Sequence, residues 1–150
     1  MDSPGPPPRR PRTLAWLIPA RLAVAERPGG GGRSHRRALR EAELRWWRAH
    51  GVRAVVSGMR SRHGLAEYAE AGLETRWHPL RDPDGARDEL PALVESVRDL
   101  LAAGGGAVLV HCDRANEWLA AADASLRRGL GLARSPRAAL AAAAADGLPV

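Results

Sequence analysis

Hydrophobic and polar residues follow two periods along this chain, and the periods predict alternating strands and helices. The clearest helix is predicted over residues 87–103, where apolar side chains recur every three or four positions and Gly104 follows as the cap. A continuous apolar run over residues 107–111 then predicts a buried strand. The apolar face of the long helix consists of Leu90, Leu93, Val94, Val97, Leu100 and Leu101.

Shorter patterns predict the other elements and, with them, the fold class. Strands are expected at residues 13–18, 21–25, 52–57 and 73–80, and helices at residues 36–50, 65–71, 118–130 and 136–146. In the first helix Leu39, Ala42, Trp46 and Ala49 share a face, so Trp46 is expected to pack on the core and Trp47 to cover its edge. Strands that alternate with helices predict an α/β fold, in which helices flank a mostly parallel central sheet.

Length and composition are those of a single globular domain. The chain has 150 residues, of which 45% are hydrophobic, enough to bury a core. Residues 1–12 are rich in proline and arginine and predict a disordered tail, so the domain is expected over residues 13–150. The one cysteine excludes an internal disulfide framework and a cysteine-based zinc cluster, which agrees with a cytoplasmic protein. No membrane span or signal peptide is expected, because the early apolar run is broken by Pro19 and Arg21.

Positive charge is concentrated at the start of the chain. All 23 basic residues are arginine, the formal net charge is +6, and residues 1–50 hold 11 arginines against 4 acidic residues. Residues 51–150 hold 12 arginines against 13 acidic residues. The absence of lysine, together with many alanines and glycines, is typical of a GC-rich genome. The charge is therefore modest evidence for polyanion binding, and nucleic acid is not expected as the main partner.

The stretch that carries chemistry is residues 104–118. An apolar strand leads into His111 and Cys112, a short loop follows, and a helix comes next. The backbone N–H groups of such a loop and the positive end of the helix form an anion site, which lowers the pKa of a thiol from about 8.5 toward neutrality. A thiolate there can attack phosphorus or a carbonyl carbon, with Asp82 or Asp84 as general acid. The alternative is that Cys112 is a small buried residue at a strand end.

The order of these elements resembles the cysteine-dependent phosphatases of the tyrosine and dual-specificity superfamily, in a compact bacterial form. The resemblance implies a three-layer phosphatase-type fold and hydrolysis of phosphomonoesters, on phosphorylated proteins or small molecules. The reaction would pass through a cysteinyl-phosphate intermediate without a metal or another cofactor. Cys112 would be the nucleophile, Asp82 the general acid, and His111 would tune the thiol by hydrogen bonding. The resemblance extends from about Leu14 to Pro136 and is carried by residues 17–23, 51–57, 68–73, 78–82 and 108–112 and by the long helix.

The loop after the cysteine departs from the family's pattern. That pattern is His-Cys, two residues, Gly, two residues, Arg, then Ser or Thr, whereas this chain has Ala115, Trp118 and Leu119 at the last three specified positions. The missing arginine would grip two phosphate oxygens with its planar fork, and losing one such donor typically costs about 10²–10³ in rate. Asp113 and Glu117 place two negative charges beside a loop meant for a dianion, and they would oppose formation of the thiolate. The phosphate-binding backbone is expected at Asp113, Arg114, Ala115, Asn116, Glu117 and Trp118.

The sequence leaves three functions open. The first is a pseudophosphatase, a phosphatase-fold protein with little or no activity that binds a partner or a ligand. The second is an active cysteine phosphatase with a rearranged phosphate clamp, in which Arg114, Arg60 or Arg62 replaces the missing arginine. The third is a basic, arginine-rich binding module. No metal site is expected, because the other histidines have no metal-ligand spacing: His35, His50, His63 and His78.

Overall fold

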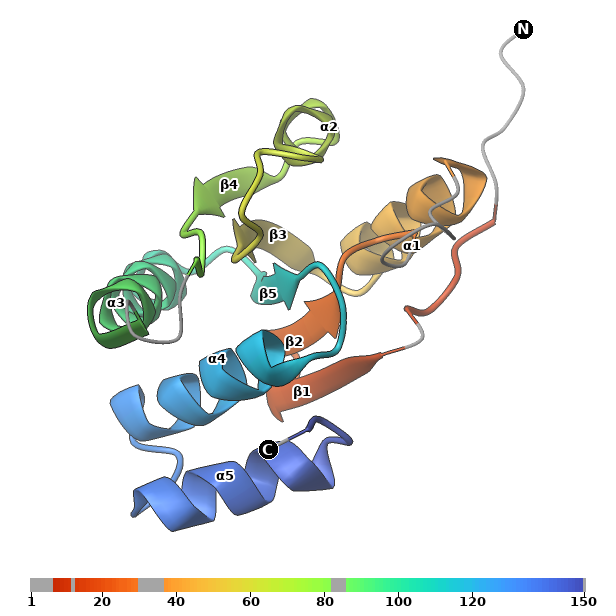
Figure 1. Ribbon diagram of the computed structural model, residues 1–150. Coiled ribbons are helices and arrows are strands. Elements are labelled where there is room, and N and C mark those ends of the chain that lie inside the picture. Colours follow the sequence, from red (N-terminus) through yellow and green to blue (C-terminus); the bar gives the residue numbers. More distant parts are fainter. Residues whose placement is uncertain (1–6, 12, 30–36, 82–85, 150) are drawn as a thin grey trace, which may run out of the picture.

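The computed structural model describes residues 7–11, 13–29, 37–81 and 86–149. Five strands and five helices alternate over most of this part of the chain (Figure 1). Their order is β1 (Leu14–Ile18), β2 (Leu22–Glu26), α1 (Arg37–Ala49), β3 (Val52–Ser57), α2 (Leu65–Glu70), β4 (Glu74–Trp77), α3 (Ala86–Ala103), β5 (Ala107–Cys112), α4 (Glu117–Gly129) and α5 (Pro136–Ala145).

The strands form one sheet with the order β1-β2-β5-β3-β4. Only β1 runs antiparallel to its neighbour among these strands, while β2, β5, β3 and β4 pair in parallel. β5 lies in the middle, between β2 and β3, and its six residues are all buried. A parallel strand buried on both faces reads as a continuous apolar run, which is why the sequence identified it.

Helices cover both faces of the sheet, and this confirms the predicted three-layer α/β fold (Figure 1). On one face α1 and α2 pack through Leu44, Trp47 and Tyr68 against β2, β3 and β5. On the other face α3 and α4 bury their apolar stripes, and α5 packs against α4. The stripe predicted for the long helix is confirmed: Leu93, Val94, Val97 and Leu100 are buried, and Leu90 and Leu101 pack partly against the same cluster.

The buried face of α1 differs from the prediction. Trp47 is fully buried, whereas Trp46 is only partly buried and stacks on His50, with ring centroids 3.7 Å apart. The roles predicted for the two tryptophans are therefore reversed: Trp47 lies inside the core, and Trp46 packs against it from the edge. The observed face also contains Glu43, a polar residue that the apolar pattern could not place inside. Its carboxylate is tolerated there because it accepts a hydrogen bond from the Gly29 backbone N–H at 3.0 Å.

The strand predicted over residues 73–80 is shorter in the structure, because β4 ends at Trp77. Beyond it, the chain turns toward the loop after β3 instead of extending the sheet. The His78 N–H donates to the Ser57 carbonyl at 2.8 Å, and the Leu80 N–H donates to the Gly58 carbonyl at 3.1 Å. Pro79 between them has no N–H for a ladder. This path brings Leu80 next to the end of β5.

The start of the chain and the lengths of the helices bear on the predicted tail and on the predicted absence of a membrane span. Within the tail predicted over residues 1–12, the Arg9 backbone N–H donates to the Ala42 carbonyl of α1 at 3.0 Å. Residues 1–6 and 12 lie outside the described residues, so the disordered tail and the domain boundary stay predictions. None of the helices in the described ranges has the length and hydrophobicity that a membrane-spanning helix requires.

Candidate functional site

A cavity of about 360 Å³ lies at the carboxyl ends of β3 and β5, where the N-terminus of α4 faces the sheet edge. This is the edge at which open α/β sheets usually bind ligands. The loop before α4 forms one wall of the cavity, and the loop after β3 forms another. The lining residues are Gly58, Met59, Arg60, Leu80, Cys112, Asp113, Arg114, Asn116, Glu117 and Trp118.

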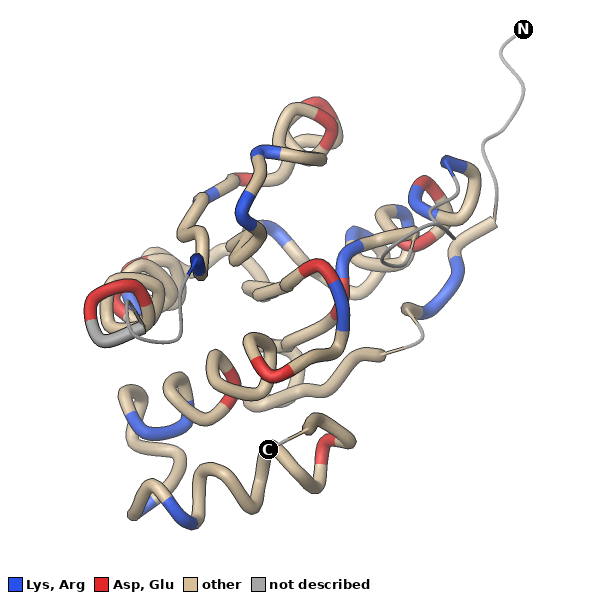
Figure 2. The backbone as a smooth tube through the Cα atoms, in the orientation of Figure 1, with Lys and Arg blue, Asp and Glu red and all other residues tan. Residues whose placement is uncertain are grey.

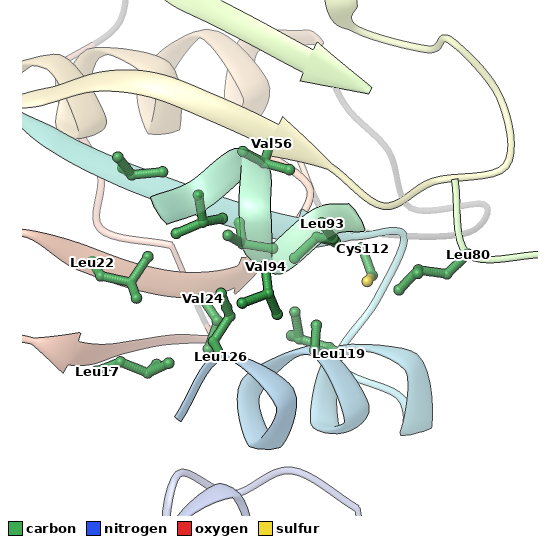
Figure 3. Packing of buried hydrophobic residues seen from close by; sticks show 14 of the residues in the cluster. Leu17, Leu22, Val24, Val56, Leu80, Leu93, Val94, Cys112, Leu119 and Leu126 are labelled. Atoms are coloured by element: carbon green, nitrogen blue, oxygen red, sulfur yellow. The ribbon is translucent and has the colours of Figure 1, made fainter. Parts of the chain in front are cut away.

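Cys112 lies at the base of this cavity and belongs to the hydrophobic core. Only 2% of the residue is exposed, and Figure 3 shows its sulfur directed toward Leu80. Gly58 covers it from the neighbouring loop: a Cβ at that position would lie 3.2 Å from Sγ. The Gly58 N–H also donates to the His111 carbonyl at 2.8 Å, which holds this loop against β5. A side chain at this position would therefore be crowded against the thiol and Leu80.

The electrostatic environment of Cys112 is the reverse of the one expected from the sequence. Burial raises the pKa of the thiol to about 12, and the negative charge of Asp113 adds to the increase. The expectation of a pKa lowered toward neutrality is therefore wrong for this structure. The main cause is desolvation of the thiolate by burial, which the spacing of residues along the sequence does not reveal. The expected opposing effect of Asp113 is confirmed.

His111 points to the opposite face of the sheet, because successive side chains of a strand alternate. Its Nδ1 lies 3.2 Å from the Cys112 carbonyl oxygen, and its Nε2 lies 3.1 Å from Tyr68 Oη. A carbonyl can only accept, so Nδ1 carries the proton and Nε2 accepts from the tyrosine hydroxyl. Burial lowers the pKa of His111 to about 4, so the ring is neutral near pH 7. His111 thus contacts the backbone of the loop, whereas tuning of the thiol stays an expectation.

Asp113 and Arg114 begin the loop and neutralise each other in part. Asp113 Oδ1 lies 3.1 Å from Arg27 Nε, and its Oδ2 lies 3.5 Å from Arg114 Nε. The Arg114 side chain is 63% exposed. At Ala115 the backbone is not left-handed, because Ala20 is the one non-glycine residue with positive φ in the described ranges. The absence of glycine there therefore causes no backbone strain.

Asn116 caps α4 and occupies part of the predicted anion site. Its Oδ1 accepts hydrogen bonds from the backbone N–H groups of Trp118 at 3.1 Å and Leu119 at 3.2 Å. These are two of the N–H groups that a helix N-terminus leaves without an intrahelical partner and that could otherwise face an anion. The Asn116 side chain therefore already accepts from two of the backbone N–H groups that a phosphate would need as donors.

Trp118 and Leu119 stand where the resemblance requires an arginine and a hydroxyl. Trp118 is partly buried, lines the cavity and packs against the core. Leu119 is fully buried in the same core, where a hydroxyl would need a hydrogen-bond partner. The cavity therefore has an aromatic ring where the resemblance requires a guanidinium group, and an aliphatic side chain where it requires a hydroxyl.

The structure separates the three arginines that could replace the clamp. Arg60 and Arg114 line the cavity, and Arg60 Nη2 donates to the Arg81 carbonyl at 2.5 Å. Arg62 lies instead over the ring of Trp77, with its Cζ 4.7 Å from the ring centroid. Asp82, the predicted general acid, lies outside the described residues.

Two residues with a role at the site carried no recognised signal in the sequence. Gly58 follows directly after β3, and a glycine at the carboxyl end of a parallel strand marks a close approach of backbone to a site. Tyr68 is the only tyrosine of the chain and is buried on α2, where a hydroxyl usually indicates a polar partner. Among the described residues, no group of three or more His, Cys, Asp or Glu side chains is arranged to hold a metal ion.

Solved structures of cysteine-based phosphatases are similar to this chain. Tk-PTP in its active form is 21% identical, with a TM-score of 0.67 over 90% of this chain and 84% of that one. PTPMT1 is 21% identical, with a TM-score of 0.60 over 83% and 77%. Kinase associated phosphatase, in a form with its catalytic-site cysteine substituted by serine, is 19% identical, with a TM-score of 0.58 over 79% and 70%.

These similarities establish the fold. No protein-family model and no curated protein matches the sequence. The chain has the α/β fold of the protein tyrosine phosphatases, with a mostly parallel five-stranded sheet flanked by helices. In such a fold the residues of the site, not the architecture, decide the activity.

Proposed function

We propose that this protein is a pseudophosphatase: it keeps the phosphatase fold and the cysteine position, has little or no phosphomonoesterase activity, and acts by binding. The observation that carries the proposal is the state of Cys112. Cys112 is only 2% exposed, and burial together with the neighbouring Asp113 carboxylate raises the pKa of its thiol to about 12, so the thiol form predominates near neutral pH. The nucleophile of the family's reaction is the thiolate, so the attacking species is almost absent.

The residues around the thiol support the same conclusion. Trp118 provides no positive charge for the phosphoryl oxygens, and one missing preorganised donor costs about 10²–10³ in rate. Asp113 and Glu117 place carboxylates in the cavity lining, where a phosphate dianion would be repelled. Asn116 competes for two N–H groups of the helix terminus. Binding of phosphate and its chemical turnover are both opposed.

One observation favours a second candidate, an active cysteine phosphatase. Arg60 and Arg114 line the same cavity as Cys112 from two different loops. If a bound phosphate drew both guanidinium groups inward, they would replace part of the missing clamp and lower the pKa of the thiol. Asp82 would then protonate the leaving oxygen.

The experiment compares purified wild-type protein with Cys112→Ser, using an aryl phosphate as substrate. We expect no turnover that depends on Cys112. We also expect iodoacetamide to leave the native thiol unmodified at pH 8 and to label it rapidly in urea, because both burial and the raised pKa protect it. Gain of turnover in the triple variant Trp118→Arg/Leu119→Ser/Ala115→Gly would support a decayed loop on an intact scaffold. Turnover of the wild type that is lost in Cys112→Ser and in Arg60→Gln/Arg114→Gln would overturn the proposal in favour of the second candidate.

A further inference from the structure

Three arginines gather beside the cavity, and together they form a surface that we call the arginine ridge: Arg60, Arg62 and Arg81. All three are exposed. In Figure 2 the blue segments of the loop between β3 and α2 and of the chain after β4 lie on the same side of the molecule. Charge counts along the chain hide this surface, because acidic residues elsewhere in residues 51–150 cancel its charge.

The arginines of the ridge are held in place by the ring of Trp77 and by one hydrogen bond between two of them. The guanidinium of Arg62 lies over the ring of Trp77 at 4.7 Å, and that of Arg81 lies 5.9 Å from the same ring centroid. Arg60 Nη2 donates to the Arg81 carbonyl at 2.5 Å. Exposed arginines lose much rotamer freedom when they bind, and these contacts remove part of that cost in advance. The ridge is therefore a preorganised cationic surface.

The charges of the ridge are not neutralised by carboxylates within the described ranges. The three guanidinium groups form no ion pair there, whereas the neighbouring Arg76 pairs with Glu74 at 2.6 Å. Glu89 approaches the ridge but accepts from the backbone N–H of Arg81, at 2.9 Å, and not from its guanidinium. Among the described residues, the planar forks of the ridge are therefore not held by a carboxylate, and a fork of this kind matches a carboxylate of another molecule.

We propose that the arginine ridge binds an acidic, extended segment of a partner protein, rich in Asp and Glu. This inference rests on the proposed non-catalytic role, because it assigns the partner that the pseudophosphatase binds. Trp77 favours a protein over a single-stranded nucleic acid. The guanidinium of Arg62 already lies over its ring at 4.7 Å, and its Nε1 donates to the Met59 carbonyl at 2.8 Å, so a base that stacked on this ring would have to compete with Arg62.

The test measures the affinity of a fluorescently labelled deca-glutamate peptide by anisotropy at about 50 and 150 mM salt. The ridge variant Arg60→Gln/Arg62→Gln/Arg81→Gln is compared with a control of equal net charge, Arg45→Gln/Arg48→Gln/Arg137→Gln, whose arginines are also exposed. We expect the ridge variant to bind at least about tenfold more weakly and the control to change by less than about threefold. The triple Arg→Lys variant of the ridge keeps the charge but loses the planar fork, and should bind with intermediate affinity.

Three results would overturn the inference. Equal weakening of the ridge variant and its control would mean that the peptide senses only net charge. Wild-type affinity of the Arg→Lys variant would mean that guanidinium geometry has no role. Tighter, ridge-dependent binding of a ten-nucleotide oligo(dT) would assign the surface to nucleic acid. The proposed function fails separately: if Cys112-dependent phosphatase turnover is found while the ridge variant still loses the peptide, the pseudophosphatase is wrong and the ridge stands.

Discussion

Replacing His111 tests how the buried ring supports the loop around Cys112. In the folded protein burial lowers the pKa of His111 from 6.5 to about 4. Between these two pH values the unfolded chain binds a proton that the folded protein excludes, so stability rises with pH. The contribution of His111 is fully present above pH 6.5 and is lost as the pH falls toward 4. At about 1.4 kcal/mol per pKa unit, it amounts to about 3 kcal/mol.

The perturbation is His111→Gln, and the measurement is the free energy of unfolding in urea at several pH values from 4 to 8, followed by tryptophan fluorescence. Between pH 7 and pH 4 the free energy of unfolding should fall by about 3 kcal/mol less in His111→Gln than in the wild type. Other groups titrate in the same range: burial raises the pKa of Asp123 and Glu43 and lowers that of His78. The difference between the two profiles isolates His111, because these groups are common to both proteins.

Tyr68→Phe is the matched control for this experiment. It removes the hydroxyl that donates to Nε2 but keeps the titrating ring, so it should lower stability by about 1–3 kcal/mol near pH 7 and keep most of the pH dependence that His111→Gln removes. Parallel profiles of the wild type and His111→Gln between pH 4 and 7 would refute the reasoning. They would mean that His111 is protonated as easily in the folded protein as in the unfolded chain.

Two further predictions concern α4. Gly129→Ala should lower the free energy of urea unfolding by about 1–3 kcal/mol, because the added methyl would lie 2.5 Å from Val94 Cγ1. This cost should be smaller in a Val94→Ala background, and an unchanged cost there would contradict the contact. Asn116→Ala should cost about 1 kcal/mol by removing the helix cap, whereas Asn116→Ser should retain most of the stability; equal losses in the two variants would show that the cap is not the cause.

Local patterns predicted most of the fold. The stripe of α3 and the apolar run of β5 depend on residues close together in sequence, and both agree with the structure. The face of α1 was predicted wrongly because two faces of that helix carry apolar residues. The choice between them depends on the neighbours that other elements bring to the helix, here Tyr68 of α2 and His111 of β5, whose rings both lie near that of Trp47.

At the candidate site the sequence identified residue types and the structure identified their environment. The spacing after Cys112 was sufficient to locate the loop, the cavity wall at Trp118 and the opposing charge of Asp113. It could not reveal that Gly58, more than fifty positions earlier in the chain, covers the thiol. The pKa of a thiol depends on desolvation, and desolvation depends on neighbours from all elements that pack around it.

By itself the sequence determined the order of strands and helices, the parallel sheet and the position of the cysteine, because these follow from periodicity and from short-range spacing. Only the tertiary structure decided which arginines lie side by side. Arg60, Arg62 and Arg81 become one surface because the chain after β4 turns back along the loop after β3. The same turn brings Leu80 beside Cys112 and excludes water from its sulfur. Burial and charge at a point in space are sums over residues that are distant in sequence, and no local pattern contains them.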